Sequence, residues 1–390
     1  MNALAKPRIV LLSCFLTPFR SGAESCTEEV AMRLSDRYEI TIVTAKLRFS
    51  LPRKDFLRDT IPVRRVGLGL SIDKWLFPFL APFAVRRVST RASSRENSSA
   101  SLRSDASSAH SLSTAQHDIV IIHAVLETFA GLALHFSRLL MPSAKRLLTL
   151  QTTNRSFLKG KIVRSPHHLT AISTALIKIA SDLGRSDVTL IPNGLDLSTM
   201  PQREKVPGSV LFVGRLEPWK GIDVLLEAFK EITNHQSPIT NASLRIVGEG
   251  SARKDLEKLS EELGLSDRVS FVGFVPIPEV YEEFAKAEIF CGLSRSEALG
   301  NVFLEAQAAG CAVIGTNIGG IPDIITHEQT GLLVPSDDSD AATAALSRLL
   351  TDGGLRSSLA TAGRGNATKY DWSVISEEYA KVYGNLLQGV

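Results

Sequence analysis

The sequence of 390 residues has few cysteines, little excess of either charge and no long apolar run. Its four cysteines form no Cys-x-x-Cys pair, which argues against a disulfide framework, and we expect a reduced, cytoplasmic protein with buried thiols. The formal net charge of +3 is too small to indicate a nucleic-acid partner. No apolar run approaches the roughly 18 residues of a membrane-spanning helix. The short apolar run at residues 9–16 favours a first strand over a signal peptide.

The most informative stretch is residues 294–311, SRSEALGNVFLEAQAAGC. Small polar residues come first, apolar residues follow at near-helical spacing from Gly300, and Gly310 is a typical helix stop. The exposed N–H groups of a helix start can hold a phosphate. Glu297 lies in the loop and Glu305 in the helix, and ionised carboxylates suit the hydroxyls of a sugar. The alternative is that both are solvated surface charges.

Two cations follow a second apolar strand, residues 209–213. Arg215 and Lys220 both lie in the loop at the predicted carboxyl end of this strand, just before an amphipathic helix that begins at Ile222. Two positive charges near a helix N-terminus can neutralise a diphosphate as it leaves. By themselves they are more typical of exposed surface charges, and only together with Glu297 and Glu305 do they indicate a site.

Strands and helices alternate along the whole chain, which predicts two domains with parallel sheets. Near the N-terminus, Ser21 and Glu24 form a capping box, and Gly22 can let the backbone approach a phosphate or an acceptor. Asn193-Gly194 predicts a turn, which suits a hinge between the domains. A serine-rich stretch from Ser89 to Ser113 predicts a disordered insertion.

Residues 46–91 are basic and surround the apolar stretch WLFPFLAPFAV at residues 75–85. Two prolines and the short length argue against a spanning helix. An apolar segment with basic flanks suits the surface of an anionic membrane. A core helix with ordinary solvated arginines is an equally good interpretation.

These motifs together resemble the retaining glycosyltransferases of family 4. The Glu-x7-Glu spacing of Glu297 and Glu305 matches that family's signature, as do Gly-Arg-x-x-x-x-Lys-Gly at residues 214–221 and Pro-Asn-Gly-x-Asp at residues 192–196. The resemblance implies an α/β fold of the GT-B type, with two doubly wound, Rossmann-like domains facing across a cleft. The implied division is an acceptor-binding domain at 1–192, with the insertion at about 89–115, a nucleotide-sugar domain at 193–370, and a final helix at 371–390 that crosses back.

The resemblance also implies the reaction and the residues that perform it. A sugar moves from a nucleoside diphosphate sugar to a hydroxyl of a glycolipid or saccharide acceptor, with retention and with no separate protein base. Glu305 binds the ribose, Glu297 and His123 the donor sugar, and the loop at Val275 the nucleobase. The residues implied in catalysis are Glu297, His123, Arg215 and Lys220, and those implied in donor binding are Glu305, Gly22, Leu299, Gly300, Asn301, Val302 and Val275.

Some positions depart from the family pattern. Ile121 replaces the first histidine of the usual His-x-His, with His123 as the second, and Asp323 stands where glutamate is common. The motifs that carry the resemblance include no Asp-x-Asp metal motif, so we expect no metal and no cofactor. Two alternatives stay open: a nucleotide-sugar epimerase or phosphorylase of the same fold, and a non-catalytic nucleotide-sugar-binding module. The nucleobase, the sugar, the acceptor and a peripheral membrane contact are also open.

Overall fold

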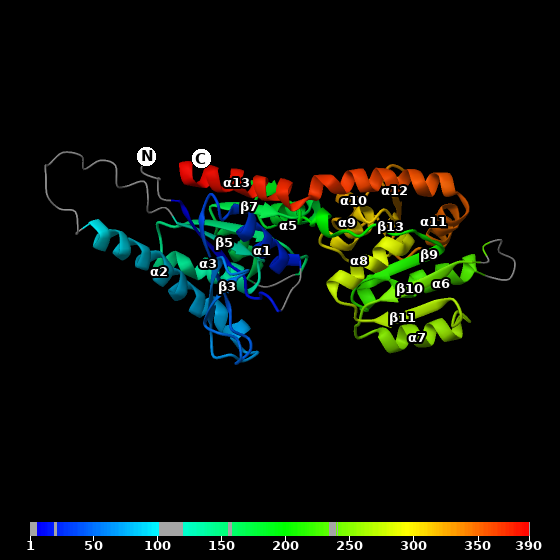
Figure 1. Cartoon of the computed structure of the whole chain (residues 1–390), viewed down its shortest axis with the longest axis horizontal. Coiled ribbons are helices and arrows are strands. Elements are labelled where there is room, and N and C mark those ends of the chain that lie inside the picture. Colours follow the sequence, from blue (N-terminus) through cyan, green and yellow to red (C-terminus); the bar gives the residue numbers. More distant parts are fainter. Residues whose placement is uncertain are drawn as a thin grey trace. The chain divides into compact units, whose positions relative to one another are not determined.

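The computed structural model describes residues 6–18, 22–100, 120–154, 158–233, 239 and 241–389, with the backbone alone for residues 90–100. The chain forms two compact units (Figure 1). The first unit contains Met1–Ile172, Leu176–Asn193 and Trp372–Val390, and the second contains Ser173–Ala175 and Gly194–Asp371. The chain therefore leaves the first unit at the Asn-Gly turn and returns to it where the final helix begins.

The described part of the first unit contains an eight-stranded sheet in the order β3-β4-β2-β1-β5-β6-β7-β8. The strands are β1 (Arg8–Leu12), β2 (Glu39–Ala45), β3 (Lys54–Leu57), β4 (Ile61–Val66), β5 (Val120–Val125), β6 (Lys145–Leu150), β7 (His168–Ala171) and β8 (Val188–Leu190). Neighbouring strands are parallel except for the β3–β4 pair, which is antiparallel. The central strands are buried on both faces, which explains their nearly continuous apolar sequences.

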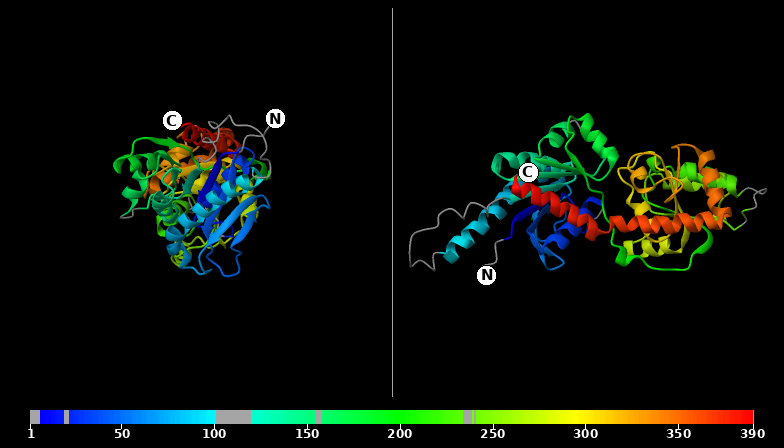
Figure 2. Two further views of the ribbon diagram at one scale, coloured as in Figure 1. Left: turned by 90° about the vertical axis from the view of Figure 1, so that its left-hand side faces the viewer. Right: turned by 90° about the horizontal axis from the view of Figure 1, so that it is seen from above.

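Helices cover this sheet. They are α1 (Gly22–Leu34), α2 (Asp73–Ala100), α3 (Phe129–Leu140), α4 (Lys159–Arg164), α5 (Thr174–Asp182) and the C-terminal α13 (Trp372–Gln388). α13 packs on α1, and its buried Trp372, Tyr379 and Tyr383 share one apolar core with β1 and β2. α2 lies alongside α3 (Figure 2).

The second unit contains, among its described residues, a six-stranded parallel sheet in the order β11-β10-β9-β12-β13-β14. The strands are β9 (Val206–Val213), β10 (Ser243–Val247), β11 (Val269–Gly273), β12 (Ala287–Gly292), β13 (Ala312–Thr316) and β14 (Leu332–Val334). The helices are α6 (Ile222–Ile232), α7 (Arg253–Glu262), α8 (Ile277–Lys286), α9 (Asn301–Ala308), α10 (Ile321–Ile324), α11 (Ser339–Thr351) and α12 (Gly353–Ala367), with 3-10 turns η2 (Leu197–Thr199), η3 (Pro218–Lys220) and η4 (Thr368–Tyr370).

Helix α2 contains the apolar stretch whose role the sequence left open. Phe77, Ala81 and Val85 are fully buried, whereas Trp75 and Phe79 are more than half exposed, so one face of the stretch is core and the other is surface. α2 continues to Ala100, which corrects the disorder expected for residues 89–100. A helix that is already nucleated by packed residues extends at little cost. The rest of the expected insertion lies outside the described residues. No helix in the described ranges is long and apolar enough to cross a membrane.

Candidate functional site

The strand order of the second unit reverses at β9. Numbered along this unit, the strands lie in the order 3-2-1-4-5-6, and sheets of this kind bind ligands at the carboxyl ends of the two strands where the order reverses. Those strands are β9 and β12, which pair with Val210 opposite Ile289. The loops that follow them, residues 214–221 and 293–300, carry the motifs singled out in the sequence. We call the two loops, together with helix α9, the switch-point site.

The first loop is held close to the second by a glycine. Gly221 has a φ of +63°, and a Cβ atom at this position would lie 1.9 Å from the carbonyl oxygen of Leu293. Only glycine allows this approach. Earlier in the same loop, the exposed Arg215 lies over the ring of Trp219, with 5.4 Å between the guanidinium carbon and the ring centroid. Among the described residues, the Arg215 guanidinium has no recorded hydrogen bond or ion pair.

Lys220 and Glu297 meet across the two loops. The Lys220 Nζ donates to Glu297 Oε2 at 2.5 Å, and less than a fifth of either side chain is exposed. A charge-assisted hydrogen bond of this length is a strong contact. The structure therefore brings together a cation and a carboxylate that lie 77 positions apart in the sequence.

Helix α9 begins without a side-chain cap. Its N-cap residue is Gly300, with a φ of +96°, and among the described residues no side chain caps the first turn. Leu299 and Gly300 are buried, and Asn301 and Val302 are half-buried. The amide groups at the start of a helix carry a partial positive charge, so this end of α9 has the chemistry of an anion site.

Glu305 lies inside the same helix and is half-buried. Burial raises the pKa of the Glu305 carboxyl from its ordinary value near 4.5 to about 7. Within the part of the chain that the structure describes, this carboxyl has no recorded hydrogen bond or ion pair. A desolvated acid without a protein partner is a typical feature of a binding or catalytic site.

Val275 lies in the loop between β11 and α8, beside the exposed Phe274. β11 is separated from β9 by β10, so this loop is on the same edge of the sheet as the switch-point site but two strands away. The structure thus gathers Arg215, Lys220 and Glu297 at the two loops and places Val275 at a distance from them along the sheet edge.

His123 is the clearest correction to the sequence analysis. Strand β5 continues past it to Val125, so His123 lies inside the strand and not at its carboxyl end. The side chain is fully buried, with Nδ1 2.8 Å from the Tyr383 hydroxyl and Nε2 2.8 Å from the Thr149 hydroxyl. Burial lowers the pKa of His123 to about 3, so the ring is neutral. The expectation that His123 reaches a sugar is therefore wrong for this structure.

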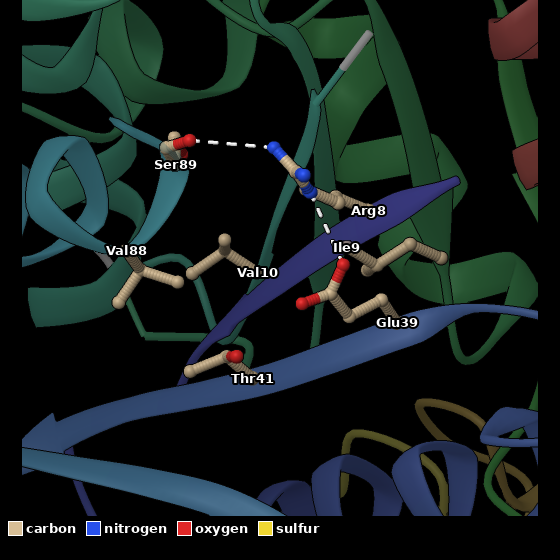
Figure 3. A pocket seen from close by; sticks show the side chains of 7 residues that line it. All are labelled: Arg8, Ile9, Val10, Glu39, Thr41, Val88 and Ser89. Carbon is tan, nitrogen blue, oxygen red and sulfur yellow. Dashed lines mark hydrogen bonds and ion pairs between the residues drawn. The ribbon is translucent and has the colours of Figure 1, made fainter. Parts of the chain in front are cut away.

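Gly22 is the first residue of α1 and is partly buried. Ser21, the expected cap, lies outside the described residues, so the contribution of this loop stays a prediction. Elsewhere in the first unit, a small hollow lies between β1, β2 and α2 (Figure 3). Arg8 reaches from it to Glu39, with Nε 3.1 Å from Oε2, and toward the carbonyl of Ser89. Arg8 opens β1, so this hollow is at the opposite end of the strand from the carboxyl edge.

The second unit is similar in sequence to a known family of proteins. Residues 201–366 match the sequence model of the family described as glycosyl transferases group 1. The phosphatidyl-myo-inositol mannosyltransferase of Mycolicibacterium smegmatis is 32% identical over 56% of this chain and 58% of its own length. A GDP-mannose-dependent phosphatidylinositol monomannoside mannosyltransferase of Mycobacterium tuberculosis is 35% identical over 44% of this chain and 46% of its own. The chain thus spans about half the length of these relatives.

The solved structure of Anabaena HepE in complex with UDP and glucose superposes on 97% of this chain and 100% of its own, with a TM-score of 0.72 and 19% identity. The fold is GT-B. Both units are α/β with parallel sheets, as the sequence predicts, apart from the antiparallel edge strand β3 of the first unit. The family match includes every residue of the switch-point site and lies within the second unit.

Around the carboxyl edges, the structure gives a contact to Asp323, noted in the sequence as a departure from the family pattern, and adds residues that the sequence analysis did not single out. Asp323 accepts from the backbone N–H of Thr174 at 2.7 Å and from its hydroxyl at 2.6 Å. Glu127 and Lys159 form a buried ion pair in the first unit. Arg295 connects the two loops of the second unit. Only Glu127 has a sequence signal, because a carboxylate directly after an apolar strand lies at the carboxyl edge of a parallel sheet.

Proposed function

We propose that this protein is a retaining glycosyltransferase, a hexosyltransferase of the family 4 type, that moves a sugar from a nucleoside diphosphate sugar to an acceptor hydroxyl. The observation that carries the proposal is the Glu305 carboxyl, desolvated and without a recorded partner in the described residues, on the uncapped helix α9. A ribose offers two neighbouring hydroxyls as donors to such a carboxylate. The family match over residues 201–366 supports the same assignment.

The roles follow from charge and position. The first amides of α9, from Leu299 to Val302, hold the diphosphate, and Lys220 and Arg215 neutralise the charge that grows on it as the sugar departs. When the diphosphate attracts Lys220, the carboxylate of Glu297 becomes available to bind hydroxyls of the donor sugar. These groups supply positive charge without a metal, so we propose metal-independent transfer.

The bond changes balance without a protein base. The bond from the anomeric carbon to the diphosphate oxygen breaks while the acceptor oxygen attacks the same face. The departing phosphate oxygen takes the proton of the acceptor hydroxyl, and the attack on the face that the diphosphate leaves preserves the anomeric configuration. The switch-point site then acts by stabilising the leaving group, and losing one such contact typically costs about 2.7–4 kcal/mol in the transition state.

The names of the similar proteins support two classes of nucleotide donor. HepE is bound to UDP, and the M. tuberculosis relative is GDP-mannose-dependent. We propose a uridine or guanosine diphosphate hexose as donor, with its base at the Val275 loop. Since two relatives act on phosphatidylinositol or its mannoside, we propose a glycolipid or saccharide acceptor in glycolipid or surface polysaccharide synthesis.

We further propose that the first unit contacts the cytoplasmic membrane surface through the exposed face of α2. Trp75, Phe79 and Phe83 lie four positions apart on this helix and are 61%, 57% and 58% exposed. Arg86 and Arg87 follow on the same helix and are exposed as well. Exposed aromatic side chains beside basic residues suit an anionic lipid surface.

Flotation with vesicles tests the membrane contact. Replacing Trp75, Phe79 and Phe83 by serine should abolish flotation with anionic vesicles, whereas Phe274→Ser, a change at a still more exposed aromatic residue of the second unit, should leave it intact. Equal flotation of the triple variant and the parent would contradict the contact.

Thermal shift with UDP, GDP, ADP and CMP tests the donor site. At about 100 times its dissociation constant, a nucleotide stabilises by roughly 2.7 kcal/mol. We expect UDP or GDP to raise the melting temperature of the parent and of the control Glu283→Ala, but not of Glu305→Ala. Equal responses of parent and Glu305→Ala would contradict the site. Conversion of the donor in the absence of any acceptor would instead indicate an epimerase. If no nucleotide changes the melting temperature of the parent, the protein is a module without donor binding.

A further inference from the structure

Arg295 joins the two loops of the switch-point site. Its backbone N–H donates to the carbonyl of Trp219 at 2.7 Å. Its guanidinium grips the carboxylate of Asp223, in the first turn of α6, with Nη1 2.9 Å from Oδ1 and Nη2 2.7 Å from Oδ2. Nη1 also donates to the carbonyl of Pro218. The side chain therefore holds both ends of the short turn η3 that carries Lys220.

A second carboxylate fixes the guanidinium from the other side. Nε donates to Asp337 Oδ1 at 2.5 Å, in the loop after β14. The hydrogen bonds to Asp223 and Asp337 raise the pKa of Arg295, so the group is always charged. Four of the roughly five N–H groups of an arginine side chain are therefore committed to protein acceptors. Arg295 is arranged to hold protein, not ligand.

We propose that Arg295 is a positioning residue that holds Lys220 in register with Glu297. Arg295 is two positions before Glu297, and its guanidinium bonds Pro218 and Asp223, which lie before and after Lys220, so its planar fork sets the separation of the two loops. Held in this way, Lys220 Nζ lies 2.5 Å from Glu297 Oε2 until the diphosphate attracts it. The catalytic part of this inference rests on the proposed transferase function, and the structural part does not.

Two variants and a matched control test the inference. Arg295→Gln removes the fork, and Arg295→Lys keeps the charge but loses the planar, bidentate grip on Asp223. Arg245→Gln is the control, since Arg245 grips Glu283 of α8 in the same bidentate way, at 2.8 and 2.9 Å, from within β10. All three are compared with the parent for folding by melting temperature before any other measurement.

Amide hydrogen exchange of residues 216–221 tests the structural part and needs no substrate. The N–H of Lys220 bonds the carbonyl of Glu217 at 2.9 Å, so its exchange reports opening of the turn. We expect the exchange of these amides to be about tenfold faster in Arg295→Gln than in the parent. The increase should be smaller in Arg295→Lys, and Arg245→Gln should exchange at the rate of the parent. Parent-like exchange in Arg295→Gln would overturn the inference.

Kinetics test the catalytic part. A displaced Lys220 should lower kcat about 10- to 100-fold with little change in the KM for the donor, because the contact matters most as charge develops. In a Lys220→Ala background, Arg295→Gln should have no further effect on kcat, and an equal fall in both backgrounds would overturn the positioning role. If the parent transfers no sugar from any donor, the proposed function fails, while the exchange result still decides whether Arg295 holds the turn.

Discussion

The two units share a sheet architecture but treat the polar groups at its carboxyl edge differently. In the first unit, Glu127 accepts from Lys159 Nζ at 3.0 Å and from the backbone N–H of Gln151 at 3.0 Å. In the second unit, the carboxyl of Glu305 and the guanidinium of Arg215 have no recorded hydrogen bond or ion pair among the residues described. The first edge is thus satisfied by the protein itself, whereas the second retains groups that a ligand can satisfy.

This difference separates residues that support a site from residues that form one. Lys159 also donates to the carbonyls of Thr152 and Asn154, at 2.9 and 2.8 Å, so it fixes the loop after β6. Gln151 and Asn193 complete the arrangement with two reciprocal hydrogen bonds of 3.1 Å. A buried network that is fully satisfied gives a rigid edge. A rigid edge of this kind can support loops that bind a ligand.

The largest effect should come from breaking the Glu127–Lys159 pair. Glu127→Ala leaves a buried ammonium without its carboxylate, which we expect to lower the free energy of unfolding by about 3–5 kcal/mol. Lys159→Met should cost a similar amount, because it leaves the opposite charge unpaired. Urea unfolding measures both. An ion pair at the surface contributes at most about 1 kcal/mol. A loss as small as that in either variant would contradict the view that this edge is held internally.

His123 offers the next test of the same comparison. His123→Ala removes the partner of two buried hydroxyls, those of Tyr383 and Thr149, and leaves a cavity. We expect a loss of about 2–4 kcal/mol in stability, with sugar transfer per folded molecule unchanged. Because the folded ring binds fewer protons than the unfolded chain, its contribution to stability is lost as pH falls from about 6.5 towards 3.

A matched change at the exposed His167 controls for the loss of an imidazole in the same unit. It should alter the pH dependence of unfolding less than His123→Ala does. A fall in transfer that exceeds the loss of folded protein in His123→Ala would restore a ligand contact to this residue and blur the comparison between the units.

Glu305 should behave in the opposite way. Its folded pKa of about 7 exceeds its ordinary value near 4.5, so the folded protein binds more protons between these values. The parent should therefore lose stability as pH rises from about 4.5 to about 7. Glu305→Gln removes the buried charge and should be more stable than the parent at pH 8, by on the order of 1–3 kcal/mol. The same variant should lose the thermal response to nucleotide.

The nucleotide affinity of the parent should rise through pH 7, because only the ionised carboxyl accepts both ribose hydroxyls. Glu305→Gln should show a flat profile. If Glu305→Gln instead destabilises the protein at pH 8, the carboxyl has a structural partner and the two units do not differ in the proposed way.

The sequence predicts the second unit better than the first, for a physical reason. Lys220, Glu297 and Gly300 occur in short motifs whose spacing follows from loops at strand ends, so their proximity could be predicted from the parallel order alone. His123 could not be placed, because an apolar run does not show where its strand ends, and β5 runs two residues further than the histidine.

Contacts between distant segments had even less signal. Nothing in the spacing of Arg295 and Asp337 indicates that they meet, since that contact depends on β14 lying at the edge of the sheet. The sequence of α2 likewise does not show which residues of its apolar stretch are buried and which are exposed. Phe77 faces the core and Phe79 the surface, a distinction that the apolar stretch itself does not show, since Phe79 stacks on Phe136 of α3 and still stays more than half exposed.

The smallest effects should come from exposed ion pairs, and they should be equal in the two units. Asp187 pairs with Arg185 in the first unit, and Glu283 with Arg245 in the second. Asp187→Asn and Glu283→Gln should each cost about 0–1 kcal/mol at low salt and less at high salt. The hydrogen bond from Arg185 lowers the pKa of Asp187 in the folded protein, so the contribution of this ion pair to stability is lost as the pH falls and Asp187 becomes protonated. If both variants lose equally little stability, the buried polar groups remain the source of the difference between the two units. A large loss of stability in one unit alone would instead place that difference at the surface.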